Sequence, residues 1–183
     1  MIKLKFLKYY LNNYYDLIKE IDKSKIIKFS NELKNIKKNK NKVLIFGNGA
    51  GAAIASHFSS DLSNTLKIKA LSFDNSAQIT CLSNDYGFDQ WIVEVLKTYA
   101  NKNDFIILLS ASGNSKNMIN AAKYLNNKKI KFISITGFTK DNKLNKTSKK
   151  KIQIQSKSYN HIEVMMELIL FTTLDLTKKF IKR

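Results

Sequence analysis

The stretch from Val43 to Leu62, VLIFGNGAGAAIASHFSSDL, constrains the fold more than any other part of the chain. Its first four residues are apolar and predict a buried strand that ends at Gly47. Two further glycines, Gly49 and Gly51, permit a tight turn with close backbone approach. The residues from Ala52 onward predict a helix. A strand, a glycine turn and a helix in this order present free backbone N–H groups that favour an anion, most often a phosphate.

After this stretch, short strands alternate with helices. The other strands that we expect are Ile68–Ser72, Phe105–Leu109, Lys131–Thr136 and Ile152–Gln155. The helices that we expect between and after them are Ser76–Ser83, Gln90–Ala100, Ser115–Leu125 and His161–Phe180. This alternation predicts an α/β fold with a parallel sheet that helices cover on both faces. Such sheets bind ligands at the carboxyl ends of their strands.

Two amphipathic helices are expected ahead of the first strand. Apolar residues recur at helical spacing over Leu4–Ile21 and again over Ile26–Ile36. These helices have no sheet of their own to cover, so residues 1–40 either pack on the core or form an oligomer interface. We find no internal repeat or interdomain linker, and we expect one domain over residues 1–183 with the sheet core in 43–183.

The chain is strongly basic, with 32 Lys and Arg residues against 14 Asp and Glu residues. Such a charge favours nucleic acid, membrane surfaces or acidic metabolites as partners. However, Arg183 is the only arginine, and specific base recognition depends on bidentate arginine. The cations are also spread through every segment, so a nucleic-acid function is disfavoured. We interpret the lysine-rich run Lys140–Lys151 as a solvated turn.

Cys81 is the only cysteine, which excludes an internal disulfide and fits a reducing compartment. No apolar run reaches the ~18 residues that a membrane-spanning helix needs. Asn, Tyr and Asp interrupt the N-terminal segment before a secretory core could form. We therefore expect a cytoplasmic protein with no membrane partner.

The glycine turn Gly47–Gly51 is the first candidate ligand site. It lacks the Lys-Ser/Thr pair of a nucleoside triphosphate loop, it reads GxGxG instead of GxGxxG, and no acidic residue ends the next strand. Nucleotide binding is therefore not indicated. Turns of this kind are also common in α/β proteins without a ligand.

The second candidate is the segment Leu108–Ser115, LLSASGNS, in which an apolar strand runs into hydroxyl and glycine residues before a helix. Ser110, Ser112 and Ser115, with the local N–H groups, form a neutral cradle suited to a phosphate monoester. The alternative is an ordinary turn with Ser115 as the helix N-cap. Because both candidate turns lie at the same edge of one sheet, the ligand interpretation is favoured over that of an ordinary turn.

The third candidate is the pair His57 and Asp61, which lie four residues apart on one helix face. This spacing suits half of a metal site, or a base beside its partner. A surface pair with a few tenths of a kcal/mol of stabilisation is the simpler interpretation. The other histidine, His161, begins the last expected helix, where we interpret it as a bystander.

A fourth candidate is the segment Ser83–Phe88, SNDYGF, which we interpret as a polar turn before Trp91. Asp85 in this turn is suited to orienting a sugar hydroxyl. It is equally suited to capping the helix that follows.

Taken together, these segments resemble the sugar isomerase (SIS) domain family and, within it, the phosphoheptose isomerases. The matching pieces, in the order of the family, are GNGAGAAIASHFSSDL, ALSFDNSAQITCLSNDYGFDQ, LLSASGNSKN, FISITGF and the closing amphipathic helix. The resemblance implies a three-layer α/β sandwich with a five-stranded parallel sheet between helices. It also implies a homotetramer, in which leading helices such as Leu4–Ile21 take part in subunit contacts near the phosphosugar sites.

The resemblance also implies a role for each candidate residue. Asp61 would be the catalytic base of an aldose–ketose isomerisation, and His57 a zinc ligand or site residue with Asp61. The residues implied to bind a phosphosugar such as sedoheptulose 7-phosphate are Asn48, Gly49, Gly51, Asp85, Ser110, Ser112, Asn114 and Ser115. The product would feed heptose, lipopolysaccharide or capsule synthesis.

The sequence departs from the family at several of these positions. The family has glutamate at Asp61, and hydroxyl residues at Gly51 and Ala111. In the last helix it carries a glutamine and, eight residues later, an acid histidine. These positions correspond here either to Ile162 and Leu170 or to Glu163 and Phe171. The alternative to an enzyme is therefore a non-catalytic relative that binds a phosphosugar or a protein partner.

Overall fold

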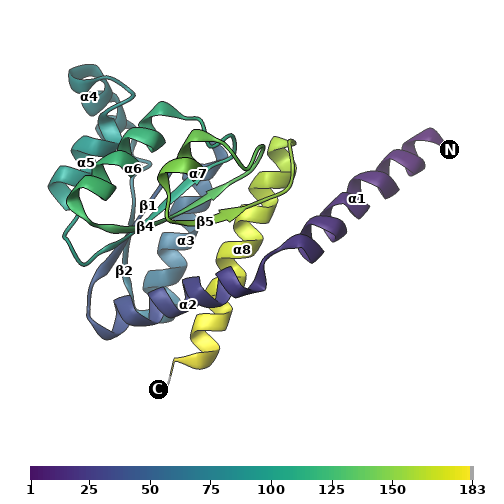
Figure 1. Cartoon of the computed structure of the whole chain (residues 1–183), viewed down its shortest axis with the longest axis horizontal. Helices are drawn as coiled ribbons and strands as arrows, with labels where there is room; N and C mark the ends of the chain where they lie inside the picture. Colours follow the sequence, from purple (N-terminus) through teal and green to yellow (C-terminus); the bar gives the residue numbers. More distant parts are fainter. Residues whose placement is uncertain (182–183) are drawn as a thin grey trace.

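A five-stranded parallel sheet forms the middle of the protein, in a computed structural model that describes residues 1–181 (Figure 1). The strands follow the order β2-β1-β3-β4-β5 across the sheet. They are β1 (Lys42–Gly47), β2 (Lys69–Ser72), β3 (Phe105–Ser110), β4 (Lys131–Thr136) and β5 (Lys150–Gln153). The predicted three-layer α/β fold is confirmed.

The central strands are apolar along their whole length because helices cover the sheet on both faces. In β1, Val43 and Ile45 face one core, and Leu44 and Phe46 face the other. The first core contains residues of α2 (Lys23–Lys38), α3 (Ala50–Leu66) and α8 (Tyr159–Phe180). The second core is formed with α5 (Trp91–Tyr99), α6 (Lys116–Lys128), α7 (Lys143–Thr147) and, at its edge, α4 (Ser76–Tyr86).

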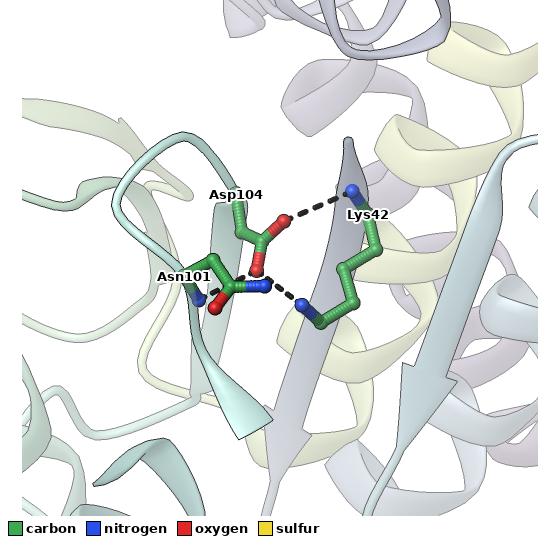
Figure 2. A network of polar contacts seen from close by, with 3 residues as sticks. All are labelled: Lys42, Asn101 and Asp104. Atoms are coloured by element: carbon green, nitrogen blue, oxygen red, sulfur yellow. Dashed lines mark hydrogen bonds and ion pairs between the residues drawn. The ribbon is translucent and has the colours of Figure 1, made fainter. Parts of the chain in front are cut away.

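A buried carboxylate joins the amino-terminal ends of the neighbouring strands β1 and β3 (Figure 2). Asp104 is 3% exposed and accepts hydrogen bonds from the backbone and side-chain nitrogens of Lys42, at 3.1 and 2.6 Å. It also accepts from the backbone N–H of Asn101, at 2.7 Å. Because a buried carboxylate is costly without such partners, these bonds fix β1 against β3 at the end of the sheet opposite the candidate ligand loops.

The first helix, α1 (Ile2–Glu20), extends away from the body of the protein (Figure 1). Leu17 is its one buried residue, and most of its apolar side chains are exposed. Tyr10 and Tyr14 pack on the ring of His161, with centroid distances of 4.5 and 4.6 Å. Burial, with a hydrogen bond to Tyr10, raises the pKa of Tyr14 to about 12. The second helix packs on the core, so the two leading helices take different roles.

Three local predictions were wrong. Lys140–Lys151 is not a simple solvated turn, because Leu144 is fully buried in α7 and the run ends inside β5. That strand accordingly starts two residues earlier than expected and ends at Gln153. Helix α4 continues through Tyr86 and ends at Gly87, which has a φ of 85°, so Asp85 is in a helix and not in a turn.

Among the described residues, no helix is both long enough and apolar enough to cross a membrane.

Candidate active site

A cavity of about 130 Å³ lies at the carboxyl ends of β1 and β3. These neighbouring strands lead into helices on opposite faces of the sheet, α3 and α6, which is the topological switch point where open α/β sheets bind ligands. The cavity is lined by Asn48, Gly51, Leu109, Ser110, Ala111, Ser112, Ser115, Tyr159, Glu163 and Met166. Its volume is below the roughly 300–1,000 Å³ of typical ligand pockets, so it suits one end of a ligand, such as a phosphate.

The glycine turn brings the start of α3 close to the end of β1. A Cβ atom on Gly47 would lie 2.1 Å from the carbonyl carbon of Gly51, so a side chain there would overlap the helix backbone. Gly49 has a φ of 56°, in the left-handed region that glycine adopts at little cost. The prediction of a tight turn with close backbone approach is confirmed, and the turn forms one wall of the cavity.

The serine loop, which we define as Ser110–Ser115, forms the opposite wall. The Ser110 hydroxyl donates to the Ser115 hydroxyl at 3.4 Å, and Ser112 Oγ accepts from the backbone N–H of Asn114 at 3.2 Å. Ser115 occupies the N-cap position of α6, yet its side chain makes no capping hydrogen bond. Its hydroxyl lines the cavity instead, which favours the ligand interpretation over the turn interpretation.

Two asparagines tie the walls together. Asn48 and Asn117 exchange two side-chain hydrogen bonds, at 3.1 and 3.0 Å, and Asn117 Oδ1 also accepts from the backbone N–H of Met118. Asn117 is 1% exposed. Sequence reasoning missed it, because an asparagine in the first turn of an amphipathic helix gives no sign of burial. The pair fixes the Asn48 side chain at the edge of the cavity.

Other predicted binding residues lie elsewhere. Gly49 belongs to the turn but does not line the cavity. The Asn114 side chain turns away and accepts from the backbone N–H of Lys143 at 3.2 Å. Asp85, in α4, accepts from the side chain of Asn84 at 3.1 Å and does not cap α5, whose N-cap is Gln90. Within one chain, the structure does not bring Asp85 to the cavity.

His57 and Asp61 lie on α3 beside α8, in a group that we call the His57 cluster, which also contains Glu167 and Phe171. The Nε2 atom of His57 is 3.7 Å from Asp61 Oδ2, and its Nδ1 atom is 3.4 Å from Glu167 Oε1. The Phe171 ring packs edge-on against His57, with a centroid distance of 4.8 Å. Asp61 is ten residues beyond Gly51 in the same helix, or about 15 Å along its axis.

The His57 cluster does not fit a complete zinc site. Structural and catalytic zinc ions take three or four protein ligands, and the side chain that α8 packs against His57 at Phe171 is a hydrocarbon ring, which cannot bind a metal ion. Across residues 1–181, no group of three or more His, Cys, Asp and Glu side chains is arranged to hold a metal ion. His57 and Asp61 thus supply two ligands at most within one chain.

The last helix also supplies residues that sequence reasoning did not assign to the site. Tyr159 and Glu163 line the cavity from the first turns of α8. Glu163 was one of two residues, with Ile162, that could correspond to the glutamine of the family's last helix. Only the packing of α8 on α3 brings it to the serine loop. His161 points away from the site, since it is 7% exposed and packs between Tyr10 and Tyr14.

Comparison with known proteins agrees with this geometry. Residues 8–137 match the family model described as SIS domain. A phosphoheptose isomerase of Buchnera aphidicola (subsp. Schizaphis graminum) is 35% identical over 139 residues, which cover 73% of this chain and 69% of that relative. A phosphoheptose isomerase of Aliarcobacter butzleri is 41% identical over 107 residues, covering 55% of this chain and 56% of that relative. The chain therefore spans little more than half the length of several such relatives in these matches.

Solved structures show the same fold over nearly the whole chain. A phosphoheptose isomerase from Francisella tularensis has a TM-score of 0.87 at 23% identity, and the match covers 98% of this chain and all of that one. A phosphoheptose isomerase from Neisseria gonorrhoeae has the same TM-score and coverage at 21% identity. At these identities, the likeness concerns the fold alone.

Proposed function

Because the chain belongs to the SIS domain family, we propose that it is a phosphosugar isomerase of the phosphoheptose isomerase type. The observation that carries the proposal is the serine loop at the switch point. Its hydroxyl groups line a cavity, and one of them occupies a helix N-cap position without capping. Hydroxyl and backbone N–H donors of this kind bind a phosphate monoester without adding charge. The net charge of +18 attracts such an anion.

The substrate is an aldose or ketose phosphate such as sedoheptulose 7-phosphate. With the phosphate in the serine loop, its carbon chain follows the face shared by α3 and α8 toward the His57 cluster. Asp61 then acts as the base that removes a proton from the carbon next to the carbonyl group. An enediol forms, and the proton returns to the neighbouring carbon. His57 lies beside Asp61 and orients it.

We also propose an assembly and a biological role. The relatives' name, phosphoheptose isomerase, supports a heptose phosphate as substrate, and we propose a place in heptose or surface-polysaccharide synthesis. We propose a homotetramer in which α1 contacts other copies, since its exposed apolar side chains include Leu4, Leu7 and Leu11. Light scattering of the purified chain would give a mass near 84 kDa, which is four times the 21.0 kDa of one chain, and a monomer mass would contradict the tetramer.

A non-catalytic phosphosugar-binding protein is the second candidate, and one observation favours it. The ring of Phe171 packs against His57, and Phe171 and Leu170 are the two residues that could stand where the resemblance implies an acid histidine. Such a protein would bind the sugar phosphate without converting it. A protein that binds only a protein partner would bind no sugar phosphate.

Proton NMR of the purified protein with sedoheptulose 7-phosphate tests the proposal. We expect new aldose resonances for the wild type and a loss of at least ~100-fold in rate for Asp61→Asn, since a positioned acid–base group contributes about 100- to 10,000-fold. Asp175→Asn is the matched control, because Asp175 is an exposed carboxylate on α8. Ligand line broadening without conversion would support the non-catalytic candidate. No response at all would contradict both.

A further inference from the structure

Glu163 places a carboxyl group in the cavity beside the serine loop. Among the lining residues it is the one with a carboxylic side chain, and the others offer hydroxyl, amide or apolar groups. It is partly buried at the second turn of α8. A carboxylate is not a phosphate ligand, so the composition of this cavity calls for a second role besides phosphate binding.

No basic side chain in the part of the chain that the structure describes pairs with Glu163. In residues 1–181, its carboxylate takes part in none of the hydrogen bonds or ion pairs of the fold, although the chain carries 32 Lys and Arg residues. The buried Asp104 differs in this respect, because its carboxylate pairs with Lys42. The Glu163 carboxyl group is therefore not engaged by the fold and is free to contact a ligand in the cavity, as an acid–base group must.

The position of Glu163 along α8 places it between the two regions of the site. Glu167 lies one helical turn further on, on the same face of the helix, and its carboxylate contacts His57. The serine loop shares the cavity with Glu163 on the other side. Glu163 therefore lies on α8 between the serine loop and the His57 cluster.

We propose that Glu163 is a catalytic acid–base residue that moves the hydroxyl protons of the isomerisation, an inference that rests on the proposed function. When Asp61 takes the carbon-bound proton of the ketose, the Glu163 carboxylic acid donates its proton to the carbonyl oxygen, and the neutral enediol forms. In the second half, the Glu163 carboxylate takes the proton of the neighbouring hydroxyl group as its oxygen becomes the aldehyde oxygen. Asp61 returns its proton to carbon. No proton is lost or gained, and no oxidant is needed.

Other groups near the cavity suit this role less well. His161 is buried between two tyrosines. Phe171 has no proton to exchange, although it stands beside His57.

The test compares Glu163→Gln, Glu163→Asp and Asp175→Asn. We expect Glu163→Gln to lower kcat for sedoheptulose 7-phosphate by at least ~100-fold, and Glu163→Asp to retain more activity than Glu163→Gln. The Kd for the sugar phosphate, from isothermal titration calorimetry, should stay within about threefold or become tighter, since a negative charge near the phosphate is removed. Asp175→Asn should behave as the wild type.

The outcomes separate the two proposals. If the wild type converts the substrate and Glu163→Gln does so at a similar rate, the role of Glu163 is wrong while the isomerase proposal stands. If Glu163→Gln loses kcat and binding together, Glu163 is a binding residue and the acid–base role is overturned. If the wild type itself converts no sugar phosphate, the isomerase proposal fails and the role of Glu163 fails with it.

Discussion

The serine loop and the His57 cluster lie on the same chain but differ in how many of the features implied by the family resemblance they retain. The serine loop has hydroxyl side chains that line a cavity, backbone that glycines bring close, and a pair of asparagines, half-buried Asn48 and buried Asn117, that fixes the cavity wall. The His57 cluster has a histidine between two carboxylates and the ring of Phe171, one of the two positions at which the family resemblance implies a histidine. The difference teaches that, in the proposed function, phosphate binding and proton transfer are held by separate structural elements, so one can change while the other stays.

The separation has a physical origin in the fold. The serine loop is set by two strand ends and by hydrogen bonds to the chain beyond β4, because Gly137 N–H donates to Ala111 O at 2.8 Å and Leu144 N–H donates to Gly113 O at 2.9 Å. The His57 cluster depends on how α8 packs beside α3. A substitution on α8 can therefore alter the chemistry without moving the loop.

The largest expected effect is that of Gly47→Ala, which removes the turn on which the cavity is built. The added Cβ atom would overlap the Gly51 backbone, so α3 must move. We expect a loss of about 2–4 kcal/mol in the free energy of unfolding, in line with strained core substitutions, and a loss of sugar phosphate binding. Urea denaturation measures the stability. Gly49→Ala is the control, since its Cβ meets no atom within 4 Å and only the left-handed φ is strained, at about 1 kcal/mol.

A smaller effect is expected of Ser112→Ala, which removes a hydroxyl from the serine loop and leaves the His57 cluster intact. Hydrogen bonds to charged groups contribute about 1.5–3 kcal/mol, so the Kd for a sugar phosphate should rise roughly 10- to 100-fold. Calorimetry gives the Kd directly. Ser60→Ala, on the exposed face of α3, serves as the matched control. Unchanged affinity of Ser112→Ala would exclude the serine loop as the phosphate site.

The smallest effect is expected of Phe171→His, which tests whether the His57 cluster lacks a third zinc ligand. The wild-type cluster supplies His57 and Asp61, and a new imidazole beside His57 would add a third zinc ligand. We expect zinc to bind Phe171→His at least about tenfold more tightly than the wild type, and a chelator to leave wild-type turnover unchanged. Competition with a chromophoric chelator measures the affinity. If chelation abolishes wild-type turnover, the ligand set is completed by groups outside one chain.

The sequence predicted the fold well because its signals are local. Continuous apolar runs such as Val43–Phe46 indicate strands that are buried on both faces, and the glycine turn marks where a strand passes into a helix. The errors came where tertiary packing overrides composition. Lys140–Lys151 appears solvated by its lysines, but Leu144 fills a gap in the second core.

The sequence predicted only those parts of the site that are formed by residues close together in the chain. The two loops could be recognised, because each carries its hydroxyl or glycine residues in one short stretch. Asn117, Glu163 and Glu167 could not, since their roles depend on pairs such as Asn48 with Asn117 that are 69 positions apart. The two alignments of the last helix also remained open in the sequence. The structure favours the one in which Phe171 faces His57.

The proposed division of the site into a serine loop that binds phosphate and a His57 cluster that transfers protons is tested most directly by calorimetry. Sedoheptulose 7-phosphate is titrated into Asp61→Asn and Ser112→Ala side by side. We expect Asp61→Asn to bind within about threefold of the wild-type Kd while its turnover is lost, and Ser112→Ala to bind at least about tenfold more weakly. Circular dichroism verifies that both variants are folded. If Asp61→Asn loses binding and Ser112→Ala keeps it, the phosphate does not bind in the serine loop, and the account is wrong.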